Sequence, residues 1–140
     1  MRYSRKAGDE KYKADMHDDL MANYREVVRS CGCTSQTDAF RLTLARPARR
    51  FWVSRARAYA VMLRLIDGDH GVLKGMKPWK REMYQEIYRR LLEAAAKPKY
   101  WGKSAYCIVP DIIAQPAPKF YIGIETMRKI FANAQKFRRK

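Results

Sequence analysis

Apolar side chains recur at helical spacing in two stretches of the chain. In the first stretch the spacing is i, i+4, i+7, i+8 and i+11, which places them on one face of a helix: Leu20, Tyr24, Val27, Val28 and Cys31. A similar stripe in the second stretch consists of Met83, Tyr84, Ile87, Leu91 and Leu92. Both stretches are therefore predicted to be amphipathic helices whose apolar face points toward a core.

A second helix is predicted to begin after Ser35. Asp38 follows three residues later, which is a near-match to a capping box and places a carboxylate in the first turn. Pro47 then prevents a helix from continuing at Arg46. The apolar residues between these signals would also fit the alternation of a strand: Phe40, Leu42 and Leu44.

A third helix is predicted to begin at Ser54, because serine is a favoured N-cap residue. The inward face of this helix is predicted to consist of Ala56, Tyr59, Ala60 and Leu63. A related stripe near the end of the chain follows Gly123 in place of the serine, and it consists of Met127, Ile130, Phe131 and Ala134.

The turn before the third helix occurs twice, as RPARRFWVS at 46–54 and as QPAPKFYIG at 115–123. Residues 35–66 align without gaps over residues 104–135. The identities are Ser35/Ser104, Ala45/Ala114, Pro47/Pro116, Ala48/Ala117 and Phe51/Phe120. Because they cluster on the pattern Pro-Ala-x-[Arg/Lys]-Phe-[Trp/Tyr]-[Val/Ile], we interpret them as an internal duplication. The preceding helices, around 21–30 and 85–94, align at a shift of 64 instead of 69, so the second copy is about five residues longer.

The predicted fold is all-α, with two related three-helix units joined by a short linker. Each unit resembles a helix-turn-helix, but its turn is longer than the usual three or four residues. The boundaries are a flexible N-terminus at 1–14, a first repeat at 15–66, a linker at 67–80, a second repeat at 81–135 and a basic tail at 136–140. In the second repeat Pro110 falls inside the second helix, which is predicted to start late or to kink.

The net charge of the chain indicates which kind of partner it binds. The chain has 140 residues, of which 47% are hydrophobic, and a formal net charge of +16. Residues 1–34 contribute only +1 of this, so the excess lies in the remainder of the chain. Such a basic domain repels itself unless a polyanion neutralises it, and basic faces bind phosphate backbones by releasing counterions. Nucleic acid is therefore the expected partner.

Other function classes have little support in the sequence. Cys31, Cys33 and Cys107 match no zinc spacing, so no metal or cofactor is expected, and Cys107 is predicted to be a small core residue. Asp15 and Asp19 could share a helix face and hold a divalent ion, but a solvated acidic face explains them better. No nucleophile, phosphate-loop or metalloprotease motif is present, so no catalytic residue is predicted. Without a long apolar run or a signal core, we expect no membrane contact and a location in the host cytoplasm or a virion.

Within the doubled turn, the recurring proline, alanine and aromatic residues are interpreted as scaffold. Packing does not require the arginines Arg46, Arg49 and Arg50 together, and basic groups before a helix N-terminus oppose its dipole. A phosphate would account for them. Arg55, Arg57 and Arg64 on the third helix could likewise reach a major groove. The full predicted set of nucleic-acid contacts is Arg41, Arg46, Arg49, Arg50, Arg55, Arg57, Arg64, Lys119, Arg128, Lys129, Lys136, Arg138 and Arg139.

Double-stranded DNA is the favoured form of nucleic acid, and the alternatives stay open. The longer turn argues against simple major-groove docking, and RNA is a second possibility because Trp52, Trp79 and Trp101 lie beside basic residues and could stack on bases. Core or interface packing is the simpler role for these tryptophans. A third alternative is a structural or virion-assembly protein with a basic surface, whose partners would be virion proteins or further copies of the chain.

The doubled pattern, in which each copy follows a Tyr-Arg helix, resembles small basic proteins encoded by phages and mobile elements of gut bacteria. The Tyr-Arg pairs are Tyr24-Arg25 and Tyr88-Arg89, and the resemblance covers about residues 15–137. In that group the motif usually reads Pro-Ala-Pro-Arg-Phe-Tyr. The second copy keeps the second proline as Pro118, whereas the first copy has Arg49. The resemblance implies a phage or mobile-element setting and no particular chemistry, since that group has no established activity.

Overall fold

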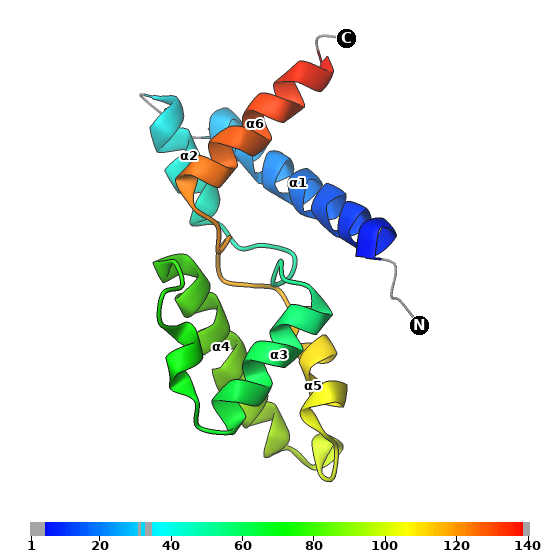
Figure 1. Cartoon of the computed structure of the whole chain (residues 1–140). Coiled ribbons are helices and arrows are strands. Elements are labelled where there is room, and N and C mark those ends of the chain that lie inside the picture. The colour runs from blue at the N-terminus through cyan, green and yellow to red at the C-terminus, as the bar shows by residue number, and fades with distance from the viewer. Residues whose placement is uncertain (1–4, 31, 33–34, 139–140) are drawn as a thin grey trace. The chain divides into compact units, whose positions relative to one another are not determined.

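The computed structural model describes residues 5–30, 32 and 35–138, and the side chains of residues 12–30, 32 and 35–136. Over this part of the chain the fold is entirely helical, as predicted, and contains no strand (Figure 1). The α-helices are α1 (Arg5–Ser30), α2 (Gln36–Leu44), α3 (Arg55–Ile66), α4 (Pro78–Ala95), α5 (Ala105–Ile113) and α6 (Ile124–Arg138). Two short 3-10 helices are η1 (His70–Leu73) and η2 (Pro98–Tyr100).

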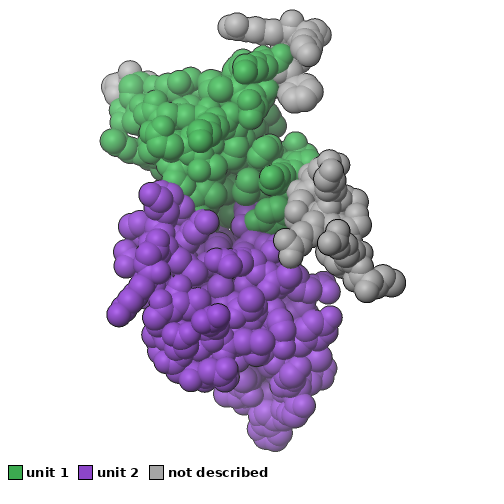
Figure 2. Space-filling model, viewed as in Figure 1, with its two compact units in different colours: residues 1–48, 118–140 green, residues 49–117 purple. Residues whose placement is uncertain are grey.

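The chain forms two compact units, which are coloured separately in Figure 2. Unit 1 consists of residues 1–48 and 118–140 and therefore contains α1, α2 and α6. Unit 2 consists of residues 49–117 and contains α3, α4 and α5. These units are grouped differently from the continuous segments 15–66 and 81–135 predicted from the sequence, because the third helix of each segment belongs to the other unit. The predicted pairing of α2 with α3 as a helix-turn-helix is consequently not found within either unit.

The core of unit 1 is built where three helices meet. Leu20 and Val27 of α1 are fully or nearly fully buried, as are Phe40 of α2 and Met127 of α6. An aromatic cluster joins the three helices, since the rings of Tyr24, Phe40 and Phe131 lie 5.1 to 5.6 Å apart in all three pairs. Such tilted and edge-to-face contacts stabilise beyond the area that they bury.

The core of unit 2 is more aliphatic. It combines α4, α5 and α3, and Phe51 from the preceding turn is completely buried. The buried residues that α4 and α5 contribute are Met83, Tyr84, Ile87, Leu91, Ala94, Ile108, Val109, Ile112 and Ile113. Those of α3 are Ala58, Val61, Met62 and Leu65. Phe51 and Val53 thus fill the core at the turn, as expected of scaffold residues.

The predicted inward face of α3 is wrong. Ala56, Ala60 and Leu63 are exposed, and Tyr59 is half-buried. The helix carries two apolar stripes with similar spacing, and the buried one is the stripe with valine, methionine and leucine. Burying these larger side chains removes more apolar surface from water, so the fold selects them over a stripe rich in alanine.

Two further apolar residues that were predicted to face a core are exposed: Val28 and Leu92. Cys107 is also exposed instead of forming part of the core. The reason is the phase of α5, because its buried face runs through the next position, Ile108, and leaves residue 107 outward. The prediction for Cys31 lies outside the described residues.

The predicted helix starts are confirmed by their caps. The Oγ atom of Ser35 accepts a hydrogen bond from the Asp38 N–H at 3.1 Å, and Ser54 Oγ accepts one from the Arg57 N–H at 3.1 Å. Pro110 does not delay α5, which begins at Ala105, 69 residues after the start of α2.

The predicted linker and termini are more regular than expected. Within 67–80 the chain forms η1, buries Leu73 and begins α4 at Pro78. From Arg5 onward the N-terminal segment belongs to α1, and the segment 136–140 is helical as far as Arg138. No helix in the described part of the chain has the length and apolarity needed to span a membrane.

One backbone arrangement occurs once in each unit. In unit 2 the Phe51 N–H donates to the carbonyl of Ile113 at 3.0 Å, and in unit 1 the Phe120 N–H donates to the carbonyl of Leu44 at 3.0 Å. The two donors, Phe51 and Phe120, are 69 residues apart in the sequence, and so are the two acceptors, Leu44 and Ile113. In unit 2 this bond ties the turn before α3 to the end of α5, and in unit 1 it ties the turn before α6 to the end of α2.

Candidate nucleic-acid interface

Both units are equally basic. Unit 1 contains sixteen Lys and Arg and eight Asp and Glu residues, and unit 2 contains fourteen and six, so each unit carries a formal charge of +8. Charge alone therefore does not single out one unit as the binding part. The local partners of each predicted contact residue decide which cations are available to a phosphate.

Two arginines of the turn have structural contacts. Arg46 is half-buried, and its Nε donates to Asn23 Oδ1 of α1 at 2.8 Å. Arg50 donates to the carbonyls of Phe51 and Val53 at 3.1 and 2.9 Å and lies over the Trp52 ring. These side chains hold the turn in shape, which the sequence had left to proline, alanine and phenylalanine alone. Arg49 is exposed.

The arginines of α3 differ in the same way. Arg64 forms an exposed ion pair with Asp69 at 3.1 Å. Arg57 is exposed, yet it forms a hydrogen bond with the buried Tyr84. Burial raises the pKa of Tyr84, whereas the hydrogen bond and the positive charge of Arg57 act to lower it. Arg55 is exposed and has no side-chain partner among the described residues. Only one of the three is fully available to a ligand.

In unit 1 the available cations among the predicted contacts lie on α2 and α6. Arg41, Lys129 and Lys136 are exposed and have no side-chain partner among the described residues. Arg128, in contrast, donates to Thr37 Oγ1 at 3.1 Å and lies 3.6 Å from a carboxylate oxygen of Glu125. Lys119 lies over the Tyr121 ring, 5.5 Å from its centroid. The predicted contacts Arg138 and Arg139 have side chains that lie outside the described part.

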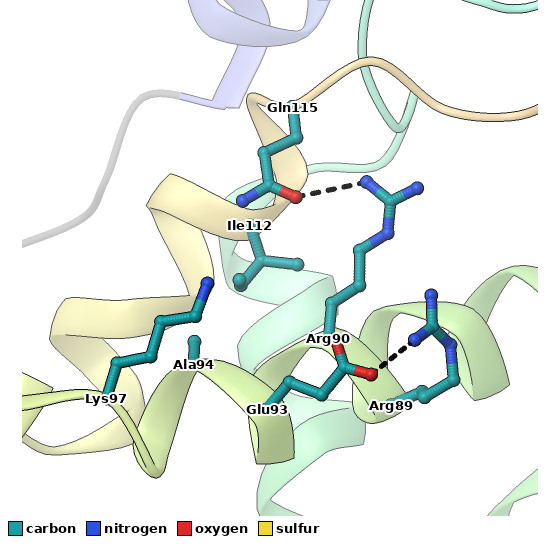
Figure 3. Close-up of a pocket in the computed structure, with 7 residues that line it drawn as sticks. All are labelled: Arg89, Arg90, Glu93, Ala94, Lys97, Ile112 and Gln115. Atoms are coloured by element: carbon teal, nitrogen blue, oxygen red, sulfur yellow. Dashed lines mark hydrogen bonds and ion pairs between the residues drawn. The ribbon is translucent and has the colours of Figure 1, made fainter.

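A pocket lies beside α4 and α5 of unit 2 (Figure 3). It is lined by Arg89, Arg90, Glu93, Ala94, Lys97, Ile112 and Gln115. Arg89 pairs with Glu93 at 2.6 Å and with Glu86 at 2.7 Å, and Arg90 pairs with Glu86 at 2.8 Å. The two guanidinium charges are thus balanced by carboxylates, which leaves Lys97 as the lining cation without a carboxylate partner in the described residues. The pocket is consequently a weak attractor for anions.

Arg90 acts mainly as a structural centre of unit 2. Its Nη1 atom donates to Gln115 Oε1 at 3.0 Å (Figure 3). The same atom donates to the Pro116 carbonyl at 3.1 Å, so that α4 is tied to the second Pro-Ala turn. Hydrogen bonds from Arg89 first, and also from Arg90, lower the pKa of Glu86 from 4.5 to about 2 although partial burial opposes the shift. Glu86 therefore remains ionised and keeps both guanidinium groups in place.

Sequence reasoning named Trp101 as a possible stacking residue but did not include the three lysines that lie near it between α4 and α5. Lys97, Lys99 and Lys103 are all exposed, and Trp101 between them is 69% exposed. A signal for this group was available, because the segment KPKYWGK interleaves basic and aromatic residues. The segment has no counterpart in the first copy, so a comparison of the two copies does not reveal it.

The described residues contain no group of three or more His, Cys, Asp or Glu side chains that could hold a metal ion. No protein-family model, curated protein or solved structure matches the chain.

Proposed function

We propose that this chain binds nucleic acid without catalysing a reaction, and that double-stranded DNA is its main target. The observation that carries the proposal is a charge of +8 on each unit together with exposed cations that lack internal partners. A cation that is already paired gains little from a phosphate, whereas an unpaired one releases counterions from the nucleic acid. The charge excess persists in both units, so both contribute to binding.

The contacts are proposed to be with the phosphate backbone. In unit 1 they come from Arg41, Lys129 and Lys136, which are exposed and on α2 and α6. In unit 2 Arg55 on the first turn of α3 serves the same purpose. Backbone contacts of this kind fix the protein on a duplex without reading its sequence. Arg46 and Arg50 support the turn instead, so they contribute to binding only through stability.

We further propose that the two halves of the chain arose by duplication. Besides the matching backbone bonds, a pair of side-chain positions supports this. Tyr59 and Tyr106 meet edge-to-face at 5.4 Å in unit 2, and the residues 69 positions away, Arg128 and Thr37, form a hydrogen bond in unit 1. The geometry recurs while the chemistry differs, as is expected when copies diverge after duplication.

The resemblance to small basic proteins of phages and mobile elements supports a proposed setting in an infected or colonised bacterial cell. The protein would act in the cytoplasm or inside a virion, where nucleic acid is abundant.

A second candidate function is assembly into a larger structure, such as a virion, through protein contacts. The observation that favours it is the outward face of α3, where Leu63 is 39% exposed and Ile66 is 47% exposed. Exposed apolar side chains that lie together are typical of surfaces that meet another protein. This alternative predicts that the chain co-purifies with particles and that binding to purified nucleic acid is weak.

A binding assay with the purified full-length chain separates these candidates. It compares one 20-base-pair duplex, each of its single strands and the corresponding RNA at one salt concentration. The proposal expects the duplex to bind most tightly. It expects Arg41→Gln, Lys129→Gln and Lys136→Gln together to weaken that binding. A control that also removes three positive charges, but from paired arginines, is expected to have a smaller effect: Arg29→Gln, Arg64→Gln and Arg128→Gln. Absence of binding to all of these nucleic acids would reject the proposal and leave the assembly role.

A further inference from the structure

The segment between α4 and α5 presents one tryptophan at the tip of a tight turn. The Lys103 N–H donates to the Tyr100 carbonyl at 3.0 Å, Trp101 has φ −59 and ψ 132, and Gly102 has φ +77. These are the features of a type II turn with glycine at the position that requires a positive φ. Trp101 therefore projects from a defined backbone and not from a loose loop.

The indole ring of Trp101 is held in place although it is exposed. Its Nε1 donates to the Ala96 carbonyl at 3.1 Å, while 69% of the residue remains accessible. The turn itself is anchored, because the Tyr100 hydroxyl donates to Asp111 Oδ2 of α5 at 2.7 Å. An exposed, oriented aromatic ring loses little entropy when a flat ligand stacks on it.

The surroundings of Trp101 are cationic. Lys97, Lys99 and Lys103 are exposed, and no acidic residue occurs between Glu93 and Asp111. Glu93 itself pairs with Arg89, and Asp111 accepts the bond from Tyr100. A flat anionic ligand fits this combination, whereas a purely apolar partner would leave three lysines against it without charge compensation.

Building on the proposed nucleic-acid binding, we infer that Trp101 is a stacking site for an unpaired base and that Lys97, Lys99 and Lys103 contact the phosphates beside it. Bases inside a duplex are stacked on one another, so the ligand of this site is a single-stranded segment. Sequence-tolerant binding of single strands generally combines these two parts, aromatic rings for bases and a basic track for the backbone. The full chain would then hold a duplex that continues into a single strand.

The test uses the full chain and three DNA probes of equal duplex sequence. One is blunt, one has a tail of six thymidines, and one has a tail of six abasic units with the same phosphates. Wild-type protein is expected to bind the thymidine tail roughly 5- to 150-fold more tightly than the abasic tail. Trp101→Ala is expected to remove this difference and to leave the affinity for the abasic tail unchanged. Trp101→Phe, which keeps a ring, is expected to retain part of the difference.

A second variant tests the lysines separately. Changing Lys97, Lys99 and Lys103 to Gln should weaken binding of both tails equally and reduce the magnitude of the salt slope by about 2, since single strands give about 0.7 per phosphate. Equal wild-type affinity for both tails, or an equal loss for both in Trp101→Ala, would overturn the inference. That result leaves the proposed function intact if the blunt duplex still binds. Failure to bind the blunt duplex would instead count against the proposed function itself.

Discussion

The guanidinium of Arg90 lies over the ring of Phe51, with its Cζ atom 4.8 Å from the ring centroid. The two residues come from α4 and from the first Pro-Ala turn, and both belong to unit 2. Because the same guanidinium also bonds Gln115 and Pro116 of the second turn, Arg90 connects α4 with both copies of the motif. Arg90, which lies outside the doubled motif, thus contacts residues of both copies of the motif and holds them against α4.

Replacing Arg90 with Met is expected to lower the free energy of unfolding by about 2 kcal/mol. The change removes charge-assisted hydrogen bonds from a site where the side chain is only 21% exposed. Urea unfolding followed by circular dichroism measures the effect. Arg64→Met is the control, because this arginine of the same unit is largely exposed and its single ion pair with Asp69 contributes little. An equal loss in the two variants would contradict the role assigned to Arg90.

The carboxylate of Glu86 predicts an acid-dependent loss of stability. Its pKa is lowered from 4.5 to about 2 in the folded chain, mainly by the hydrogen bond from Arg89. A depressed pKa stabilises the folded state above the unfolded pKa, and this contribution disappears as pH falls from about 4.5 to about 2. The free energy of unfolding, measured across this pH range, should therefore fall more steeply with decreasing pH for the wild type than for Glu86→Gln. Parallel curves for the two proteins would contradict the prediction.

The scaffold interpretation of the turn predicts large and similar effects in both copies. Phe51→Ala and Phe120→Ala should each lower the free energy of unfolding by about 3 to 5 kcal/mol, because both rings are buried. Pro47→Ala should change it much less, since this proline is exposed. Thermal unfolding of the three variants decides the matter. A small effect at either phenylalanine would show that the copies do not share one packing role.

Much of the local structure could be predicted from the sequence, because caps and prolines act over a few residues. The starts after Ser35 and Ser54 are confirmed in this way. The grouping of helices could not be predicted, since α3 and α6 could each complete either unit and only packing decides between them. The inward face of α3 was wrong for a related reason, as two apolar stripes were available and the neighbouring helices select one.

The positive charge of the candidate site could be predicted from the sequence, but the intramolecular contacts of its cations could not. All the predicted cations were visible in the sequence, yet Arg46 lies against Asn23, twenty-three positions earlier in the chain. A long-range bond of this kind leaves no local pattern. The sequence shows Trp101 as an aromatic residue beside basic ones, but the fixed orientation of its ring depends on the turn and on the Ala96 carbonyl.

Arg46 is predicted to matter for stability more than for direct binding. Arg46→Ala removes the part-buried bond to Asn23 and should lower the free energy of unfolding by about 1 kcal/mol. At a temperature where the variant is fully folded, its affinity for duplex DNA should decrease less than that of Arg41→Ala. Electrophoretic mobility shifts with both variants provide the comparison. A larger loss for Arg46→Ala in folded protein would make this residue a direct contact.

The central claim is that exposed cations bind the phosphate backbone, and its most direct test is the salt dependence of duplex binding. Association constants of the full chain for one blunt duplex are measured from low to moderate salt. Contact with about six phosphates predicts a slope near −5 for the logarithm of the association constant against the logarithm of the salt concentration. Changing Arg41, Lys129 and Lys136 to Gln should reduce the magnitude of that slope by about 3. A wild-type slope near zero would contradict the account.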